Sequence, residues 1–360
     1  MNITIINSKG HWKNGWVGSQ TDLQTLVKSL ERNDFRVEIF EVDSLDSLEK
    51  ILELQDAHSL ILPNAYYVNR YEGSEETVWM ADVIEAYNLP YIGSGSKTLQ
   101  DVLQKDICQS ILKENNLPIP QFAMIRQSQA GNEKAILEAS ELTYPAVVKL
   151  NSESGSMGME EKSLVENQDA AIAQIREMMQ RYQSDVIVEE FLPSDDITIA
   201  YLQGKNGEYK LLTTWYLVSN KPGLTSIMGQ KERFMPWGGV KRMAPVKDEH
   251  ILKQVEKLVP KVCEALKIRD ITRVDGRLDK NGQLKFFDVN GFPALCFPES
   301  AGVQQAIVCF PDYEDSYIFD TLINTIVLSA ANRYHLTVPN AVHLNNFFTL
   351  SLTPQNTVLQ

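Results

Sequence analysis

The 360-residue sequence has 34 Lys and Arg residues against 47 Asp and Glu residues, which gives a formal net charge of −13. The length predicts two or three domains, and a hydrophobic fraction of 43% with 22% charged residues is typical of an ordinary globular protein. No basic stripe, no apolar run of the ~18 residues that span a bilayer and no signal-peptide layout is present, so we expect no nucleic-acid partner, no membrane partner and a cytoplasmic location.

The first ninety residues alternate short apolar runs with helical periods, which predicts a βαβαβ layout with a parallel sheet. A dinucleotide fingerprint is absent, because the first strand is followed by GHWKNGWVGS rather than by GxGxxG. Residues 76–88, ETVWMADVIEAYN, are expected to form a helix. The Gly/Ser cluster in LPYIGSGS then ends a Rossmann-like N-terminal domain, which we place at residues 1–95.

A second unit begins with a helical period over residues 97–116 and includes a strand at Ala146–Val148. The following Ser/Gly loop has Lys149 at its entrance. Gly155 and Gly158 would let its backbone amides approach a phosphate while the lysine supplies positive charge, although an ordinary surface turn has the same composition. We place this central domain at residues 96–188.

The third unit, residues 189–360, is expected to open with a strand, a polar loop and a strand in VIVEEFLPSDDITIAYL. Helices are predicted at residues 248–268 and 313–334, with a hairpin between them. The fold class that these elements indicate is α/β (α+β).

The hairpin sequence is ITRVDGRLDKNGQLKFFDVN, and its Asn281-Gly282 pair predicts a two-residue turn. In that register Asp275 faces Asp288 and Arg273 faces Asn290. Phe286 then shares the face of Asp288, because side chains alternate along a strand.

Two facing carboxylates repel unless a cation lies between them, and their oxygens suit Mg²⁺ or Mn²⁺ rather than zinc. The residues alone leave a second interpretation open. In it, the pair belongs to a solvated face that Arg273 and Arg277 neutralise.

Three segments, VVKLNSESGSMGM, VIVEEFLPSDDITIA and TRVDGRLDKNGQLKFFDVNGFPAL, resemble in their order and spacing the ATP-grasp superfamily, and more narrowly the D-alanine–D-alanine ligase family. The resemblance extends from about residue 89 to Pro298. It implies a three-domain ATP-grasp fold and an ADP-forming ligase that uses ATP and Mg²⁺ (or Mn²⁺).

The resemblance also implies roles for individual residues. Those matched to ATP binding are Lys105, Lys149, Ser154, Gly155, Ser156, Gly158, Glu189, Leu192, Asp196 and Lys231. Asp275, Asp288 and Asn290 match the metal ligands. Arg273 matches the arginine that stabilises the reacting oxygen, and Ser300 matches the serine that binds the second amino acid's carboxylate.

The sequence departs from the family where the substrates bind. Family members hold the ammonium of the first amino acid with a glutamate and a serine in the first βα loop, whereas NSKGHWKNGWVGS has no acidic residue. An aromatic and basic set replaces them, made up of His11, Trp12, Lys13, Trp16, Tyr66, Tyr67 and Arg70. This set either lines a pocket for a larger, anionic or cyclic acceptor or merely packs a loop.

Our first hypothesis from the resemblance is a ligase of specialised metabolism that phosphorylates an acceptor oxygen and couples it to an amino acid's amine. The ligase that joins serine or a similar amino acid to mycosporine-glycine is an example. D-alanine–D-alanine ligase or another dipeptide ligase is the alternative, and a catalytically silent ATP-binding sensor is a third. The expected partners are a small-molecule acceptor and an amino acid, and the resemblance allows a homodimer.

Overall fold

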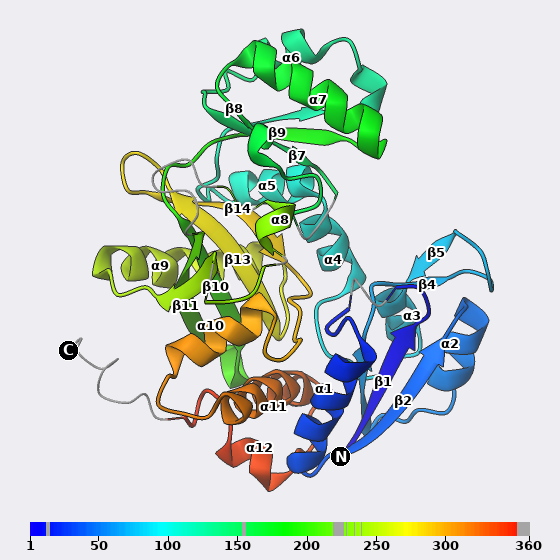
Figure 1. Cartoon of the computed structure of the whole chain (residues 1–360). Helices are drawn as coiled ribbons and strands as arrows, with labels where there is room; N and C mark the ends of the chain where they lie inside the picture. The colour runs from blue at the N-terminus through cyan, green and yellow to red at the C-terminus, as the bar shows by residue number, and fades with distance from the viewer. Residues whose placement is uncertain are drawn as a thin grey trace.

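A computed structural model describes residues 1–11, 15–152, 156–218, 227, 229–233, 235–238 and 240–350. Its elements form three layered units around three main sheets (Figure 1). The mixture of helices and sheets confirms the predicted α+β class. Within the described ranges, no helix has both the length and the apolar character needed to cross a membrane.

The N-terminal unit contains a parallel sheet of order β2-β1-β3, as the βαβαβ pattern predicts. Its elements are β1 (Asn2–Ser8), α1 (Gln20–Arg32), β2 (Arg36–Val42), α2 (Leu45–Leu52), β3 (Ser59–Pro63), β4 (Tyr67–Asn69), β5 (Thr77–Trp79) and α3 (Met80–Ala86). The expected helix at 76–88 is wrong over its first turn, because residues 77–79 pair with β4 as a small hairpin. Its β-branched and aromatic side chains fit a strand better than a helix.

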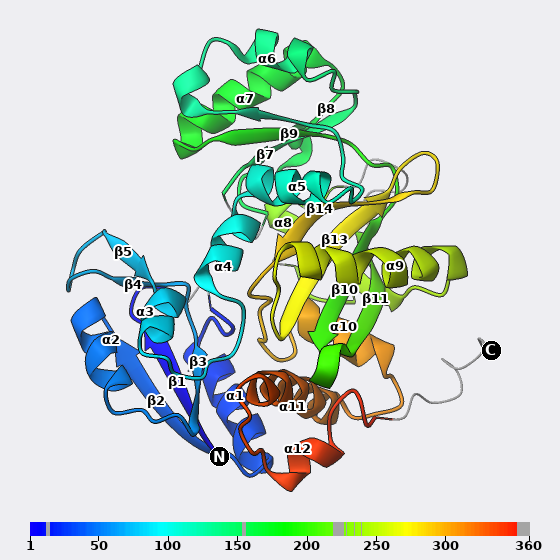
Figure 2. The ribbon, with the colours of Figure 1, turned by 180° about the vertical axis from the view of Figure 1, so that it is seen from behind.

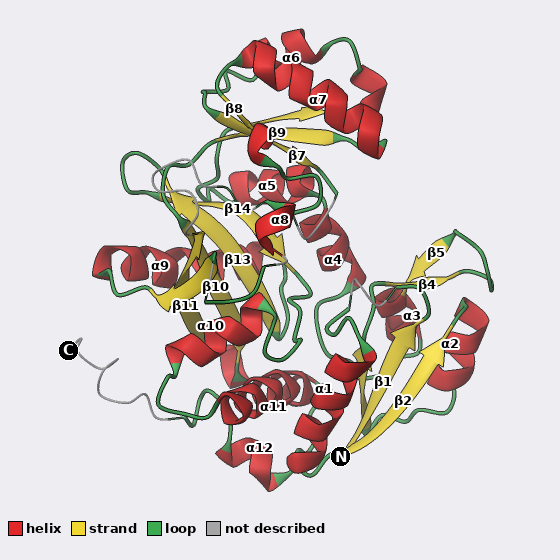
Figure 3. Ribbon diagram, in the orientation of Figure 1, coloured by secondary structure: helices red, strands yellow, loops and turns green. Residues whose placement is uncertain are grey.

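The central unit contains a sheet of order β6-β9-β7-β8, covered by α6 and α7 (Figure 3). Its elements are α4 (Ser96–Leu103), α5 (Lys105–Glu114), β6 (Phe122–Ile125), α6 (Glu133–Ala139), β7 (Ala146–Leu150), β8 (Leu164–Val165), α7 (Gln168–Tyr182) and β9 (Val186–Glu190). The single helix predicted over 97–116 is broken into α4 and α5, because Gln104 has an extended backbone (φ −94°, ψ 105°).

The C-terminal unit contains an antiparallel sheet of order β12-β11-β10-β13-β14. Its elements are β10 (Asp196–Gln203), β11 (Tyr209–Val218), α8 (Gln230–Arg233), β12 (Lys241–Pro245), α9 (Glu249–Ala265), β13 (Ile271–Leu278), β14 (Leu284–Asn290), α10 (Ala301–Cys309), α11 (Asp315–Arg333) and α12 (Asn340–Leu344). Helix α9 lies on one face of this sheet, and α8 and α10 lie on the other (Figures 1 and 2).

The apolar face of the large sheet packs against α4, α5 and α9. Val274, Phe286 and Val289 from the hairpin share one buried cluster with residues of all three helices. The opposite face carries Asp196, Thr198 and Asp275, so the candidate site belongs to that part of it, whereas Ala200 and Leu202 on the same face are buried in a second core cluster. We propose to keep three units but to end the central one after Glu190, because a boundary at 188/189 would cut through β9.

A buried ion pair in the central unit gives a prediction about acid stability. Glu133 is 1% exposed and accepts hydrogen bonds from Arg176 at 3.0 and 3.3 Å. The Arg176 guanidinium lowers the pKa of Glu133 from 4.5 to about 2, against the opposing effect of burial. Because the pKa is depressed in the folded state, this stabilisation is present above pH 4.5 and is lost as the pH falls toward 2.

We expect Glu133→Gln to lower the free energy of unfolding by about 1–2 kcal/mol at pH 7, since Arg176 is largely exposed and its charge is screened. The difference from the wild type should shrink below pH 4.5 in urea titrations. Glu138→Gln is the matched control, because its pair with Lys134 on the same helix is exposed at both ends. A difference that stayed constant down to pH 3 would contradict this assignment.

Candidate active site

The β13–β14 hairpin places Asp275 directly opposite Asp288 and Arg273 directly opposite Asn290, as the sequence predicts. The predicted two-residue turn is nevertheless wrong. Asp279 and Gln283 close a three-residue loop in which Gly282 has φ +76°, and this offsets the register by one residue. A bulge between Asp275/Gly276 restores the register before the carboxylates.

The bulge also changes which side chains face the site. Phe286 is fully buried in the apolar core, so its predicted place beside Asp288 is wrong. Phe287 instead lies on the polar side, where the Lys149 Nζ atom stands 4.6 Å from its ring centroid. The extra residue thus puts two consecutive side chains, Phe287 and Asp288, toward the cleft.

Asp275 is the most heavily bonded carboxylate of this face. It accepts from Arg273 Nε (3.0 Å) and Arg273 Nη2 (2.8 Å), from Thr198 Oγ1 (2.5 Å) and from Asn290 Nδ2 (3.2 Å). Burial opposes the charge of Arg273, but Asp275 and Asp288 together raise its pKa above the ordinary value. Arg273 is therefore a permanent cation beside the paired carboxylates.

Asp275, Asp288 and Asn290 supply three oxygen-bearing side chains on one surface, which is the donor chemistry that Mg²⁺ prefers. No group of three His, Cys, Asp or Glu side chains that would hold a metal alone occurs in the part of the chain that the structure describes. The set fits a Mg²⁺ ion that takes its remaining ligands from nucleotide phosphates and water.

The central sheet contributes Lys149 and Glu189. Lys149 Nζ lies 2.5 Å from Glu189 Oε2, and Gln109 Nε2 donates to the other oxygen at 2.6 Å. The carboxylate of Glu189 is thus held by two side chains. The backbone carbonyl of Leu192, farther along the same connection, accepts from Arg277 at 3.2 Å.

Two more of the expected nucleotide residues lie at this junction. Asp196 pairs with Arg277 at 2.5 Å, so its carboxylate already has a cationic partner on the neighbouring strand. Lys105 begins α5, and its backbone N–H donates to Asn151 just beyond β7 at 3.1 Å. The start of α5 is therefore fixed against the end of the strand that carries Lys149.

The loop after β7 is only partly described. Ser156 and Gly158 both have a left-handed backbone, with φ +57° and +71°. A Cβ atom at Gly158 would lie 3.1 Å from the Tyr182 ring, so a larger residue fits poorly. Ser154 and Gly155 lie outside the described residues.

The short helix α8 carries a second basic residue, Arg233, beside the expected Lys231. The charge of Arg233 interacts with Arg273, Asp275 and Asp288, and burial together with Arg273 lowers its pKa. Lys231 lies on the same turn and is exposed. The charge of Arg233 is therefore close enough to interact with both facing carboxylates.

Ser300 stands at the N-cap position of α10 and is 9% exposed. Its hydroxyl makes no hydrogen bond to any of the described residues, although a buried hydroxyl normally finds a partner. An unsatisfied hydroxyl at a helix N-terminus fits an anionic ligand group.

The fold brings together only some of the aromatic and basic residues that were predicted to line the acceptor pocket. Tyr66 stacks on Phe292 at 5.0 Å, Tyr67 contacts Trp79 at 4.6 Å, and His11 hydrogen-bonds Asn69 at 2.8 Å. These side chains extend from the N-terminal unit to the segment after Asn290.

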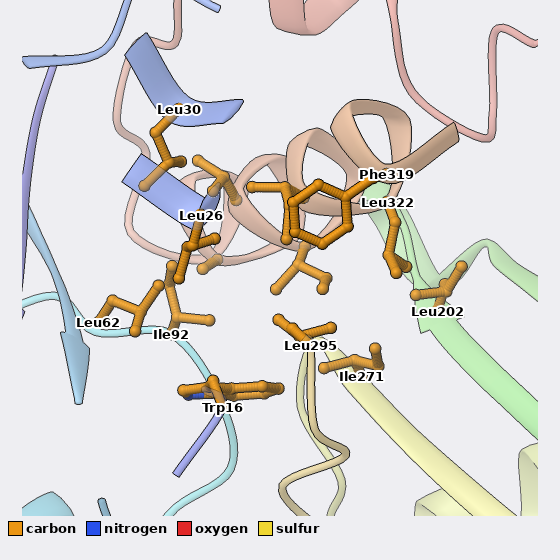
Figure 4. Packing of buried hydrophobic residues seen from close by; sticks show 14 of the residues in the cluster. Trp16, Leu26, Leu30, Leu62, Ile92, Leu202, Ile271, Leu295, Phe319 and Leu322 are labelled. Carbon is orange, nitrogen blue, oxygen red and sulfur yellow. The ribbon is translucent and has the colours of Figure 1, made fainter. Parts of the chain in front are cut away.

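Arg70 does not join this set, and Trp16 joins it only from the core, where its ring centroid lies 4.2 Å from that of Phe292. Trp16 is fully buried and packs against Leu26, Leu62, Ile92 and Leu295 in the core between α1 and α11 (Figure 4). Arg70 pairs with Glu76 across the β4–β5 hairpin at 2.5 Å. Trp12 and Lys13 lie outside the described residues.

Sequence reasoning missed Phe287, Thr198 and Arg233. The sequence could have placed Thr198 on the same face as Asp196, because the two are two residues apart in one strand. Its pairing with Asp275 could not be predicted, because it depends on β10 and β13 being neighbours in the sheet. Nothing in the sequence pointed to Arg233, because the segment around it has neither helical nor strand periodicity.

The central sheet with Lys149 and the C-terminal sheet with the facing pair Asp275 and Asp288 are the two sheets of an ATP-grasp ligase, an enzyme that forms a C–N bond with ATP and Mg²⁺ and releases ADP. Residues 111–300 match the family described as "D-ala D-ala ligase C-terminus". The chain belongs to this family.

Individual relatives agree with this classification. A D-alanine–D-alanine ligase of Aquifex aeolicus is 25% identical over 260 residues, which cover 72% of this chain and 80% of the relative. The solved D-alanine–D-alanine ligase from Bacillus anthracis complexed with ATP has a TM-score of 0.67 at 17% identity and covers 93% of this chain and 99% of its own. VanG D-Ala:D-Ser ligase from Enterococcus faecalis has a TM-score of 0.62 at 17% identity, with coverages of 90% and 99%.

Proposed function

We propose that this ligase phosphorylates an oxygen of an acceptor larger than D-alanine and then couples that acceptor to the amine of an amino acid. The observation that carries the proposal is the wall formed by Tyr66, Tyr67, Trp79 and Phe292 beside the metal hairpin. Burial raises the pKa of Tyr66, and Asp288 adds to the effect, so this phenol is neutral and close to the metal face.

The first βα loop offers no carboxylate of its own to hold an ammonium group. The segment from Asn7 to Ser19 contains no Asp or Glu, and Glu76 of the nearby hairpin is paired with Arg70. A neutral aromatic surface favours an acceptor with an apolar or conjugated ring over a small zwitterion, because binding a charge there would cost desolvation without a partner. A ligase of specialised metabolism, such as one that acts on mycosporine-glycine, would meet this description.

We further propose how the site divides its work. Lys105, Lys149 and the Ser154–Gly158 loop hold the phosphates, Glu189 and Leu192 meet the adenine, and Asp196 meets the ribose. The metal ligands are Asp275, Asp288 and Asn290. Arg273 stabilises the reacting oxygen, Arg233 or Lys231 approaches the transferred phosphoryl group, and Ser300 binds a carboxylate.

Phosphoryl transfer needs alignment and neutralisation of charge more than covalent help, so this collection of groups suits it. Lys149 and Asp196 are paired with Glu189 and Arg277, and both pairs must rearrange to contact a nucleotide.

The alternative is ligation of D-alanine to D-alanine, which the Aquifex aeolicus relative favours. Measurement of ADP release with a matrix of acceptors and amines separates the two. We expect ADP release that requires both a ring-containing acceptor, with mycosporine-glycine as the first candidate, and an amino acid such as serine. Release with D-alanine alone would establish the alternative, and tight ATP binding without release for any pair would indicate a sensor.

A further inference from the structure

Asn151 is a buried polar residue that directly follows β7, the strand that carries Lys149. Its exposed fraction is 2%. Its backbone N–H donates to the carbonyl of Asp185 at 3.0 Å, which continues the pairing of β7 with β9 by one residue. Because side chains two residues apart in a strand share a face, Asn151 lies on the same face as Lys149.

Asn151 also caps helix α5. The first four N–H groups of a helix have no partner within it, and Gln104 at the N-cap position of α5 provides no side-chain hydrogen bond. Asn151 accepts from two of these groups instead. Its backbone carbonyl accepts from Lys105 at 3.1 Å, and its side-chain Oδ1 accepts from the N–H of Asp106 at 3.0 Å. The end of a neighbouring strand thus replaces the missing cap.

The side chains of Asn151 and Asp106 complete a reciprocal pair. Asn151 Nδ2 donates to Asp106 Oδ1 at 2.7 Å, while Asn151 Oδ1 accepts from the Asp106 N–H. Asp106 is 7% exposed, and its second oxygen accepts from Arg126 at 3.4 Å. A buried carboxylate requires such partners, so this pair fixes the first turn of α5 against the end of β7.

One turn farther along α5, Gln109 makes a second link to the same sheet. It is 1% exposed, and its Nε2 donates to Glu189 of β9, whose other oxygen pairs with Lys149. Gln109 follows Lys105 by four residues and therefore lies on the same side of the helix. Helix α5 also packs against β14, the strand that carries Asp288 (Figures 1 and 2). Two polar links thus hold this helix at a fixed position relative to the strand of Lys149.

We propose that Asn151 and Asp106 set the position of Lys105 relative to Lys149, so that both ammonium groups reach the phosphates of one nucleotide. Both are positioning residues, because they act on the backbone from which the Lys105 side chain extends. The inference rests on the proposed phosphate-binding roles of the two lysines. A displacement of about 1 Å in a group that aligns a substrate is enough to impair its contact severely.

The test compares the affinities of the full-length protein for ATP with Mg²⁺ and for adenosine, by isothermal titration calorimetry. Adenosine lacks the phosphates, so the ratio of the two affinities measures the phosphate contacts. Asn151→Ala should lower this ratio by about tenfold, as expected for one lost contact to a charged group, and leave the affinity for adenosine unchanged. Asp106→Ala keeps both hydrogen bonds of the cap and should lower the ratio by about threefold.

An exchange of the two side chains tests the reciprocal pair directly. Asn151→Asp brings a second carboxylate against Asp106, and the ratio should fall. Adding Asp106→Asn restores the pair with the donor and acceptor side chains exchanged. In this double variant the ratio should recover to within about threefold of the wild-type value.

Asn167→Ala is the matched control, because Asn167 caps α7 in the same unit by accepting from the Ala170 N–H at 3.0 Å. It should lower the midpoint of urea unfolding without changing the ratio. In a Lys105→Gln background, Asn151→Ala should change the ratio by less than about twofold, because the lysine through which Asn151 acts is gone.

A purely structural role of Asn151 predicts another pattern. Equal losses of affinity for ATP and adenosine, or an undiminished effect of Asn151→Ala in the Lys105→Gln background, would overturn the inference. A double variant that binds ATP no better than Asn151→Asp alone would also overturn it. If neither Lys105→Gln nor Lys149→Gln lowers the ratio, the proposed phosphate-binding roles are themselves wrong and the inference fails with them.

Discussion

Asp288→Asn is expected to lower kcat about a thousandfold, because a metal-bridged phosphoryl group loses several kcal/mol of transition-state stabilisation when a charged ligand becomes neutral. The side chain keeps its shape, so the hairpin register and the buried neighbours Phe286 and Val289 should be undisturbed. The KM for Mg²⁺ should rise in the same variant. Steady-state ADP release over a range of Mg²⁺ concentrations measures both effects.

Asp46→Asn is the control for this substitution. It makes the same chemical change in an exposed ion pair with Lys50 on α2, far from the metal face. Its kcat and its Mg²⁺ dependence should equal those of the wild type. If Asp288→Asn turned over within about tenfold of the wild type at saturating Mg²⁺, Asp288 would not be a ligand of the catalytic metal.

Arg273→Ala is expected to lower kcat by about a hundredfold to a thousandfold with little change in the KM for ATP, because its guanidinium acts on charge that develops in the transition state. Arg273→Lys keeps the positive charge but loses the two-pronged contact with Asp275, and it should recover only part of the rate. Parallel measurement of kcat and of the KM for ATP separates this effect from a loss of nucleotide binding.

Arg32→Ala is a matched control, since Arg32 also donates two hydrogen bonds to one aspartate, Asp320, from Nε at 2.9 Å and from Nη2 at 2.6 Å. That pair joins α1 to α11, two helices that lie below β13 and β14 in Figure 1. Its loss should reduce thermal stability and leave kcat unchanged. Equal losses of kcat in the two variants would mean that Arg273 acts only through stability.

The hairpin shows what the sequence could predict and why. The alternation of side chains along the two strands predicted that Asp275 faces Asp288, and the structure confirms this pairing. The prediction nevertheless assumed a two-residue turn and regular strand pairing without a bulge. The loop at Gly282 adds one residue of offset and the bulge before Asp288 removes it. The two shifts cancel at Asp275 and Asp288, so the predicted pairing holds there. Between the loop and the bulge the register stays shifted by one residue, which is why Phe286 and Phe287 lie on the opposite faces from those predicted.

Other parts of the site depend on contacts between distant segments, which periodicity does not encode. Trp16 looked like a pocket residue because it sits in a polar loop, yet the packing of α1 against α11 makes it core. Lys241 and Arg233 meet only because an irregular segment folds back onto β12. Strand alternation and the resemblance to the ligase family both pointed to the facing carboxylates, and neither pointed to Arg233 or Lys241.

The central claim is that a metal-bound nucleotide lies between Asp275 and Asp288 on one side and Lys149 on the other. Crystals grown with Mn²⁺ and a non-hydrolysable ATP analogue test it through the anomalous scattering of manganese. The account predicts an anomalous peak within bonding distance of both carboxylates. It also predicts that Lys149 contacts the phosphates of the nucleotide and no longer pairs with Glu189. A nucleotide bound elsewhere, or manganese that avoids both aspartates, would contradict it.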